Sequence, residues 1–373
     1  MILIARAPIR ISLLGEGIGA PACDERWGGL TIGATINHYA YTILTPGYAD
    51  ELRITSADYR TFFRGSTGDG LADDDLNLPK AIARYFNLRD GLTVFLASQI
   101  PPGVGLGSSN SVAVSMIKAL AFWCGLDLNP EEVADLACHI WVEKLGLSAG
   151  KQNHYVSAFG GLNCITFSRS GVTVEPLRLP IGTHEALESN LMLFYGRLSS
   201  SSSTIFQRQE RGSQQGDGET KLQLSVIREL GLEIRAALER GDLESFGALL
   251  HSSWVEECKL PGNEAATPFL AQCYRVAREN GALGGKISGS DDGGFLMLYC
   301  PVERQDGVTE ALEAMGLERF PFAFERQGVE VMQAITWPRP QTPSVFPFVN
   351  GRSQESRMGF FAAPVMGQNQ PTI

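Results

Sequence analysis

The sequence predicts a protein of two domains that combine strands and helices. Its 373 residues, 44% of them hydrophobic, are enough for a substantial core, and a chain of this length more often forms two domains than one. Strand-like runs dominate the first hundred residues, whereas apolar residues take up helical spacing from Ser111 onward. Segments of both kinds occur again in the second half of the chain.

The first half contains four early strand-like runs, which are separated by glycine- and aspartate-rich connectors. These runs lie at 2–14, 30–45, 51–63 and 92–98. Apolar residues then recur at spacings of three and four, which predicts two helices, at 111–124 and at about 130–145. Short strands are expected to follow at 160–167 and 172–179.

The second half is expected to continue in the same way. We predict a strand at 191–198, helices at 221–240 and 266–280, a glycine-rich segment with a strand at 286–300, and a further helix and strand up to about Trp337. The polar residues that follow the strand at 191–198 have the composition of a mobile loop. The tail, 338–373, has several prolines and glycines and no periodicity, which predicts an extended arm or disorder.

Charge and cysteine content exclude several classes of protein. A formal net charge of -10 and a pI near 5.1 argue against binding to nucleic acid or to an anionic membrane surface, because both favour clustered Lys and Arg. Seven cysteines, an odd number without a CxxC pair, argue against a disulfide framework or a zinc site and favour a reducing compartment. The N-terminal run lacks the apolar core of a signal peptide, so we expect a cytoplasmic protein.

The stretch PPGVGLGSSNS, 101–111, joins the strand at 92–98 to the first predicted helix. A helix N-terminus offers unpaired N–H groups and a partial positive charge, and glycines let the backbone wrap closely around a phosphate group. The alternative is a tight turn in which Ser108 or Ser109 merely caps the helix. The pattern is not a Walker A loop, because GxxxxGK[ST] is absent.

This stretch resembles the second motif of the GHMP kinases, small-molecule kinases that include galactokinase, homoserine kinase and mevalonate kinase. APIRISLLGEG, at 7–17, resembles the first motif of that family, and GGKISGSDDGGFL, at 284–296, resembles the third. Within the family, four stretches most resemble the bacterial D-glycero-D-manno-heptose 7-phosphate 1-kinases: RAPIRIS, GGLTIGATIN, GKQNHYVSAFGGLN and NGALGGKISG. The resemblance covers roughly residues 3 to 336.

The resemblance implies a two-domain α+β GHMP kinase fold, with a ribosomal-protein-S5-like N-terminal domain, a ferredoxin-like C-terminal domain and the active site between them. The expected boundaries are 1–180 for the N-terminal domain and 181–337 for the C-terminal domain. It also implies ATP and Mg²⁺ as cofactors and transfer of phosphate to the anomeric hydroxyl of a heptose phosphate or a related higher-sugar phosphate, in nucleotide-sugar biosynthesis. The sequence leaves open whether the protein is a monomer or a homodimer.

Residue roles follow from the same resemblance. The nucleotide phosphates would be cradled by Gly103, Gly105, Gly107, Ser108 and Ser109.

Two further groups would act around these phosphates. Ser109 and Glu143 would hold magnesium; the spacing of Glu143 also places it on or beside an apolar helix stripe, where a carboxylate needs a metal or, alternatively, a salt bridge. Arg10 would lie near the reacting hydroxyl, where a fixed cation stabilises developing charge, unless it is a surface charge at a strand end.

The largest departure from the heptose kinases is Asn153, which stands where those enzymes carry an aspartate, the family's usual candidate for the catalytic base. An amide cannot accept the proton of the sugar hydroxyl. Homoserine kinases also lack the aspartate and are thought to transfer phosphate directly, and phosphoryl transfer depends mainly on positioning and charge stabilisation. His154 could serve as a substitute base, although a packed or solvent-facing histidine is the simpler interpretation.

Further departures concern the loops that are expected to face the substrate. Gly19 replaces an aspartate that contacts sugar hydroxyls, for which Glu16 or Asp24 could compensate. Two acidic residues, Asp291 and Asp292, interrupt the glycine run of the third motif after Gly289 and oppose anion binding unless they turn outward or a cation bridges them.

The last candidate for substrate binding is Arg197, at the start of RLSSSSST, which could bind a distal sugar phosphate. A flexible lid is the alternative for this segment.

Two other functions therefore stay open. The protein could be a GHMP-fold protein that has lost ATP-dependent kinase activity and binds a sugar phosphate, or an enzyme with non-kinase chemistry in the same cleft. Weak nucleotide binding would favour the former.

Overall fold

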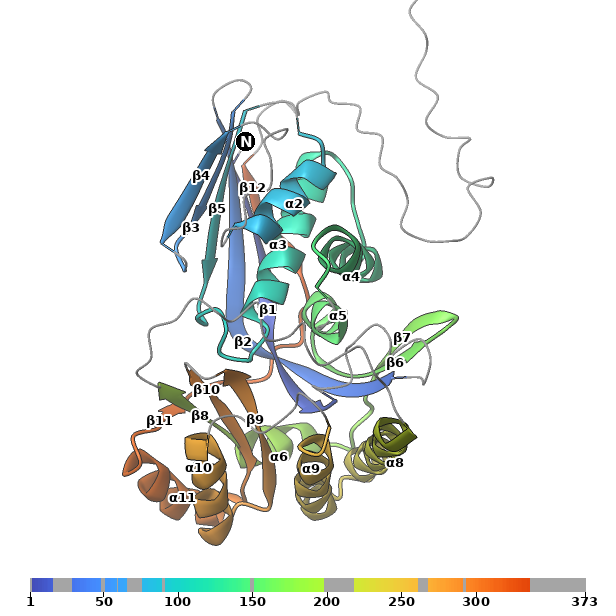
Figure 1. Cartoon of the computed structure of the whole chain (residues 1–373), viewed down its shortest axis with the longest axis vertical. Coiled ribbons are helices and arrows are strands. Elements are labelled where there is room, and N and C mark those ends of the chain that lie inside the picture. Colours follow the sequence, from blue (N-terminus) through green and yellow to red (C-terminus); the bar gives the residue numbers. More distant parts are fainter. Residues whose placement is uncertain are drawn as a thin grey trace, which may run out of the picture.

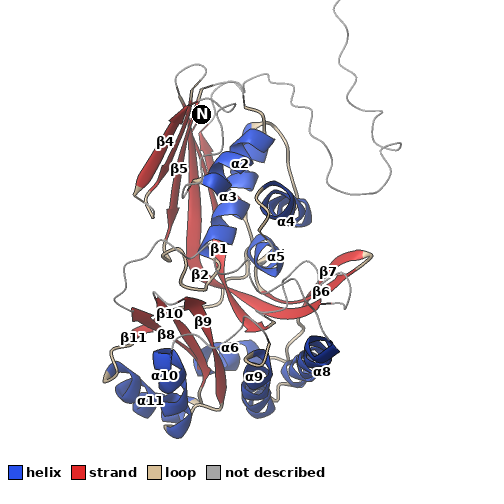
Figure 2. Ribbon diagram, viewed as in Figure 1, coloured by secondary structure: helices blue, strands red, loops and turns tan. Residues whose placement is uncertain are grey.

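Two β-sheets form the framework of the molecule, one above the other in the view of Figure 1. A computed structural model describes residues 2–15, 29–47, 51–58, 60–65, 76–88, 91–147, 151–197, 218–260, 268–290 and 293–335. The two sheets contain eight and four strands, respectively. Helices cover one face of the larger sheet and lie beside and below the smaller one (Figure 2).

The larger sheet has the strand order β12-β1-β2-β5-β3-β4, and β6 joins it through β2 and carries β7. Its strands are β1 (Ile2–Leu14), β2 (Gly29–Pro46), β3 (Leu52–Ser56), β4 (Thr61–Gly65), β5 (Leu92–Ser98), β6 (Leu162–Ser168), β7 (Gly171–Pro176) and β12 (Glu330–Ile335). All described pairings are antiparallel except that of β3 with β5. The helices that pack on this sheet are α2 (Asn77–Tyr85), α3 (Ser108–Trp123), α4 (Pro130–His139) and α5 (Lys151–Phe159).

The smaller sheet has the order β11-β8-β10-β9. Its strands are β8 (Leu191–Arg197), β9 (Gly284–Ser290), β10 (Gly293–Tyr299) and β11 (Glu318–Phe320). The helices in this half of the chain are α6 (Thr183–Asn190), α8 (Gly218–Arg240), α9 (Leu243–Glu257), α10 (Pro268–Glu279) and α11 (Gln305–Glu313), with a 3-10 turn η2 (Val302–Arg304). Of these, α8 packs on α9 and against β2 of the larger sheet. The third motif, which was expected to contain one strand, is thus a hairpin of β9 and β10.

A continuous hydrophobic core joins the two sheets. Apolar residues of β1 and β2, among them Ile9, Ile11 and Ile32, belong to the same buried cluster as Phe246 of α9 and Phe295 of β10. Burial of this cluster supplies a large apolar contribution to stability, of roughly 25 cal/mol for each Å² removed from water. The two halves of the chain are therefore packed against each other where β1 ends and β2 begins.

The last strand requires one correction to the expected C-terminal domain, 181–337. β12 pairs with β1, from Ile2 opposite Ile335 to Arg6 opposite Glu330, so residues 330–335 complete the N-terminal sheet. The Nε atom of Arg6 donates a 2.7 Å hydrogen bond to Glu330 at this edge. The expected tail, 338–373, lies outside the described residues.

Most predicted strands are confirmed, but four helices are absent from the sequence-based prediction. These are α2, α5, α6 and α9. For α5 the reason is physical: residues 152–158 are all buried, so its polar and apolar side chains show no amphipathic period. The helix expected at about 130–145 is α4 followed by a π-helical turn, η1 (Ile140–Lys144). None of the described helices is long and apolar enough to cross a membrane.

A close approach of β2 to α5 gives a test of this packing. A Cβ atom added to Gly33 would lie 2.6 Å from Cγ2 of Val156, so we expect Gly33→Ala to lower the free energy of unfolding by about 1–3 kcal/mol. Chemical denaturation would measure this change. Gly307→Ala in α11 is the matched control, because nothing lies within 4 Å of its added methyl group and alanine favours helix. Equal stability of the Gly33→Ala and wild-type proteins would contradict the close contact.

Candidate active site

The loop before α3 alternates glycines with buried apolar anchors. Gly103, Gly105 and Gly107 have φ angles of 81°, 91° and 71°, a left-handed conformation that favours glycine. Val104 and Leu106, which lie between them, are buried in the core shared by the two sheets. The apolar side chains thus fix the loop, while the glycines leave its backbone without side chains.

Helix α3 begins at Ser108, and the first hydrogen bond of its backbone runs from the Ser111 N–H to the Gly107 carbonyl oxygen at 3.0 Å. The N-cap is Gly107, and no side chain caps the helix. The interpretation of Ser108 or Ser109 as a capping residue is therefore wrong. The first N–H groups of a helix have no partner within it, and here they face the glycine loop.

The two serines at the start of α3 have different environments. Ser108 is buried, and its hydroxyl donates to Oγ of Ser98 at 2.9 Å or to the Ile100 carbonyl oxygen at 3.0 Å. Ser98 in turn donates its N–H to Asp58, whose pKa is raised by burial although this hydrogen bond acts to lower it. The Ser109 side chain is partly exposed and makes no hydrogen bond within the described part of the chain. Ser108 thus fastens the loop, while Ser109 stays accessible to a ligand.

Arg10 of β1 lies against the N-terminus of α3. Arg10 is only 3% exposed, and a Cβ atom added to Gly107 would lie 3.1 Å from Nε of its guanidinium. The interpretation of Arg10 as a surface charge is therefore wrong. A guanidinium beside the positive end of a helix dipole creates an environment that favours an anion.

Asn153, near the start of α5, is connected to the first turn of α3 through Asn110. Its Nδ2 atom donates to Oδ1 of Asn110 at 3.4 Å. The Nδ2 atom of Asn110 is 3.1 Å from Nε2 of His154. The Oδ1 atom of Asn153 is buried and has no hydrogen-bond partner within the described part of the chain. This carbonyl oxygen is therefore available to accept a hydrogen bond from a ligand.

His154 is a packed histidine rather than a substitute base. It is fully buried and lies edge-on to Trp141, with ring centroids 5.2 Å apart. Because Nε2 accepts from the Asn110 amide, the ring proton lies on Nδ1, which is 3.7 Å from Sγ of Cys138. Both ring nitrogens are thus engaged within the core.

Two serines connect β1, α3 and α5, the three elements that carry the predicted site residues. Ser111 of α3 and Ser157 of α5 both donate to the Pro8 carbonyl oxygen of β1, at 3.0 Å and 2.7 Å. The two hydroxyl oxygens are also 3.1 Å apart. All three positions are buried, so the polar contacts are worth more than they would be in water. This lock fixes the relative positions of Arg10 and Asn153.

Glu143 does not lie on the apolar stripe that the helical period predicted. It is exposed, within the π-helical turn η1, where the Leu145 N–H bonds to the Ile140 carbonyl oxygen at 3.2 Å. A π turn contains more residues than an α turn, so positions after Ile140 rotate away from the stripe. The argument that a buried carboxylate here needs a metal is therefore wrong, and its role as a magnesium ligand stays a prediction.

The remaining substrate-binding candidates are only partly described. Arg197 is the last residue of β8, and only its backbone is described. Gly289 of β9 pairs with Gly294 of β10. Glu16, Asp291 and Asp292 lie outside the described residues, as do Gly19 and Asp24. The structure thus brings together Arg10, the glycine loop, both serines and Asn153.

Asn110 and Ser157 are contributions to the site that the sequence analysis did not assign. Each is a polar residue in a helix whose other positions are largely buried, which is the signal that could have identified them.

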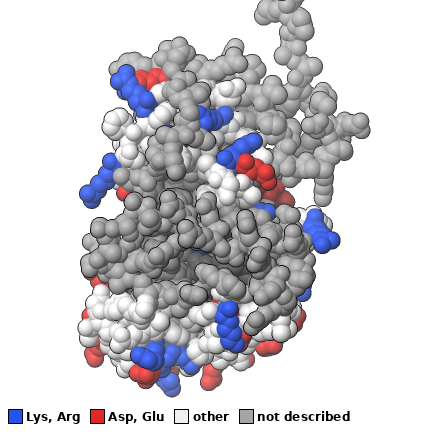
Figure 3. Space-filling view, in the orientation of Figure 1, with Lys and Arg blue, Asp and Glu red and all other residues white. Residues whose placement is uncertain are grey.

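On the described part of the face in Figure 3, basic and acidic side chains are interspersed, without a broad patch of one sign.

Comparisons with known proteins show which family this chain resembles. Residues 77–161 match the GHMP kinases N terminal domain, and residues 234–320 match the GHMP kinases C terminal domain. The chain is 27% identical over 334 residues to the D-glycero-alpha-D-manno-heptose 7-phosphate kinase of Campylobacter jejuni, covering 87% of this chain and 97% of the relative. It is also 27% identical to the mevalonate kinase of Thermococcus sibiricus, over 90% of this chain and 100% of the relative.

Solved structures show the same likeness. A D-glycero-D-manno-heptose 1-phosphate kinase from Bacteroides thetaiotaomicron is similar with a TM-score of 0.72 and 27% identity, covering 90% of this chain and 100% of that one. A putative sugar kinase from Campylobacter jejuni has a TM-score of 0.70 at 25% identity, over 88% and 98%. The resemblance and the two-domain α+β fold that the motifs predicted are confirmed.

The two serines of α3 give a paired stability test. Ser108→Ala removes a buried hydrogen bond that fastens the loop, so we expect it to lower the free energy of unfolding by about 1–2 kcal/mol. Ser109→Ala, which removes no hydrogen bond within the described part of the chain, is the control and should change stability by less than about 0.5 kcal/mol. Thermal and chemical unfolding would measure both. Equal effects of the two substitutions would contradict the different environments of these hydroxyls.

Proposed function

We propose that this chain, which belongs to the GHMP kinase family, phosphorylates the anomeric hydroxyl of a heptose phosphate or a related higher-sugar phosphate with ATP. The observation that carries the proposal is the contact of Arg10 with Gly107 at the N-terminus of α3. A guanidinium, a helix end and a bare glycine backbone meet there. The γ-phosphate of ATP is an anion that suits this environment.

The glycine loop would bind the nucleotide through its backbone. The phosphates would lie along Gly103, Gly105 and Gly107 and accept hydrogen bonds from the first N–H groups of α3. Ser108 would contribute its backbone N–H, since its hydroxyl is committed to Ser98 and Ile100. Binding of the phosphates by backbone N–H groups in this way requires no lysine in the loop.

The residues at this helix end fit a magnesium ion. The Ser109 hydroxyl makes no hydrogen bond within the described residues, and Mg²⁺ is commonly held by one or two protein oxygens together with substrate phosphates. We propose Ser109 as one ligand and Glu143 as the second. The ion would neutralise charge on the phosphates and orient them.

Transfer would proceed by direct attack of the sugar hydroxyl, without a carboxylate base. A bond forms between the hydroxyl oxygen and the γ-phosphorus as the bond from phosphorus to ADP breaks, and the hydroxyl proton passes to a phosphoryl oxygen. Asn153 would orient the hydroxyl by accepting its hydrogen bond at Oδ1. Arg10 would stabilise the charge that develops on the transferring group.

The substrate class rests on the relatives. The curated relative from Campylobacter jejuni is a heptose 7-phosphate kinase, and a similar solved structure is a heptose 1-phosphate kinase. We propose that the sugar and its distal phosphate contact Glu16, Arg197, Gly289, Asp291 and Asp292. Glu16 follows the stretch RAPIRIS, Gly289 ends the stretch NGALGGKISG, and Asp291 and Asp292 come directly after it.

Calorimetry of ATP and ADP binding, with and without Mg²⁺, tests the nucleotide half of the proposal. We expect micromolar, magnesium-dependent binding that weakens at least tenfold in Ser109→Ala, because this substitution removes a metal ligand. Ser225→Ala, on an exposed position of α8, is the matched control and should bind as the wild type does. An absence of nucleotide binding by the wild type would overturn the kinase proposal and favour a sugar-phosphate binding protein or non-kinase chemistry.

Asn153→Asp tests whether the site is built around an amide. Replacing Nδ2 by a carboxylate oxygen sets two acceptors, at positions 153 and 110, against each other at about the 3.4 Å of the present bond. We therefore expect kcat/KM for D-glycero-D-manno-heptose 7-phosphate to fall at least tenfold in a coupled ADP-release assay. Asn280→Asp, an exposed change of the same kind, should have no effect. Faster phosphorylation by Asn153→Asp would show instead that a base at this position is missing.

A further inference from the structure

Two neighbouring amide side chains at the start of α5, Gln152 and Asn153, end in buried carbonyl oxygens. Gln152 is 4% exposed and Asn153 is 9% exposed. Neither Oε1 of Gln152 nor Oδ1 of Asn153 accepts a hydrogen bond from any residue that the structure describes. The proposed mechanism uses the Asn153 oxygen for the reacting hydroxyl, whereas the Gln152 oxygen is still without a donor.

Gln152 lies on the side of α5 that packs on β2. Val156 follows it by four residues and so shares its side of the helix, and a Cβ atom added to Gly33 would lie 2.6 Å from Cγ2 of Val156. The end of α5 reaches Thr35, whose N–H donates to the Gly161 carbonyl oxygen at 3.1 Å. Because α5 thus follows β2 from Gly33 towards Thr35, Gln152 lies towards the start of β2, beside the end of β1.

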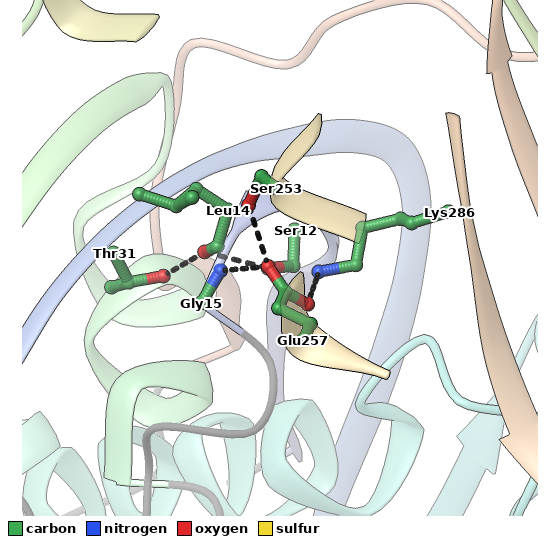
Figure 4. Close-up of polar contacts among 7 residues, drawn as sticks. All are labelled: Ser12, Leu14, Gly15, Thr31, Ser253, Glu257 and Lys286. Atoms are coloured by element: carbon green, nitrogen blue, oxygen red, sulfur yellow. Dashed lines mark hydrogen bonds and ion pairs between the residues drawn. The ribbon is translucent and has the colours of Figure 1, made fainter. Parts of the chain in front are cut away.

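Three hydrogen-bond donors at the end of β1 and the start of β2 already have acceptors (Figure 4). The hydroxyls of Ser12 and Thr31 both donate to the Leu14 carbonyl oxygen, at 3.0 Å and 2.6 Å. The Gly15 N–H donates to the buried carboxylate of Glu257 at 3.3 Å. None of these three donors is therefore available to the side-chain carbonyl group at the start of α5.

Stability does not explain a glutamine at position 152. A buried carbonyl oxygen without a donor loses its hydrogen bonds to water on folding, and an apolar side chain of the same length would avoid this loss. A ligand that brings a hydroxyl group would restore the bond. The unpaired oxygens of Gln152 and Asn153 together suit a ligand with two neighbouring hydroxyl donors.

The proposed substrate has such a pair of hydroxyls. In the ring form of an aldose, the anomeric carbon is bonded to the ring oxygen and to C2, and in a heptose C2 carries a hydroxyl group. The ring oxygen can only accept a hydrogen bond, so it cannot satisfy a second carbonyl oxygen. Of the two neighbours of the anomeric hydroxyl, only the C2 hydroxyl can therefore donate to such a group.

We propose that Gln152 binds the C2 hydroxyl of the sugar through its side-chain carbonyl oxygen, while Asn153 binds the anomeric hydroxyl. This inference rests on the proposed function and adds a residue that determines specificity beside the reacting centre. Two adjacent hydrogen bonds fix the orientation of the sugar as well as its position, so the anomeric oxygen stays aligned with the transferring phosphoryl group. A sugar without the C2 hydroxyl leaves the Gln152 oxygen unpaired in the complex and is bound less well.

Steady-state kinetics with two sugars test this inference. The substrates are D-glycero-D-manno-heptose 7-phosphate and its 2-deoxy analogue, and the variant is Gln152→Met, which keeps the length of the side chain but removes the carbonyl oxygen. We expect kcat/KM to fall about fivefold or more for the heptose phosphate and less than about twofold for the analogue, because only the former loses a hydrogen bond. Both sugars are measured on the same variant, so a smaller amount of folded protein would affect both equally.

Two controls separate binding of the sugar from a structural role. Gln272→Met, on an exposed position of α10, is the matched substitution and should leave kcat/KM for both sugars unchanged. Gln152→Met should melt no earlier than the wild type, because it removes a buried oxygen without a donor. A clearly lower melting temperature would show that this oxygen has a structural partner and would count against the inference.

The outcomes distinguish this inference from the proposed function. Equal losses of kcat/KM for the two sugars would overturn the role of Gln152 and leave the kinase proposal intact. A wild-type protein that transfers no phosphate to either sugar would refute the kinase proposal, and calorimetry of sugar binding would then give the same comparison without phosphate transfer. Weaker binding by Gln152→Met of the heptose phosphate alone would support the inference, whereas unchanged binding, or no binding by the wild type, would overturn it.

Discussion

The contact between Arg10 and the first turn of α3 is the constraint on which the rest of the site depends. Burying a guanidinium beside the positive end of a helix is unfavourable unless anionic or polar groups offset it. The packing around β1 holds Arg10 in this buried position. That packing begins in β1, where odd-numbered residues up to Ala7 face the helices and odd-numbered residues from Ile9 onward belong to the core shared with the smaller sheet.

The change of side along β1 coincides with an irregularity in its pairing with β2. The register shifts between Pro8 and Ile9, where Pro8 lies opposite Tyr39 and Ile9 opposite Ile36. Beyond this point Ile9 and Ile11 face the smaller sheet, so Arg10, between them, faces α3. The carbonyl oxygen of Pro8, at the same irregularity, accepts the hydroxyl bonds from α3 and α5. This irregular position thus determines which way the Arg10 side chain points. It also supplies the carbonyl oxygen that binds α3 and α5.

The parts of the fold and of the site that could be predicted are those with a local pattern of polar and apolar residues along the sequence. The long strands β1 and β2 and the glycine loop were predicted, because β-branched residues and glycines mark them locally. Helix α5 was not, because residues 152–158 are buried on every side. Glu143 was misplaced because no local pattern reveals a π turn. Asn110 and Glu257 were missed because their partners are far away in the sequence, Asn153 and Gly15 respectively.

The absence of a carboxylate at position 153 is consistent with the environment that the structure gives it. The Asn153 side chain lies at the end of a buried chain of polar groups that continues through Asn110 to His154. An amide can both donate into this chain and present an acceptor to a ligand, whereas a carboxylate can only accept. An ionised group here would also require desolvation without a cation among these partners. Under the proposed kinase function, this chain of polar groups is consistent with a mechanism in which orientation by Asn153 and charge stabilisation by Arg10 take the place of proton abstraction by a side chain.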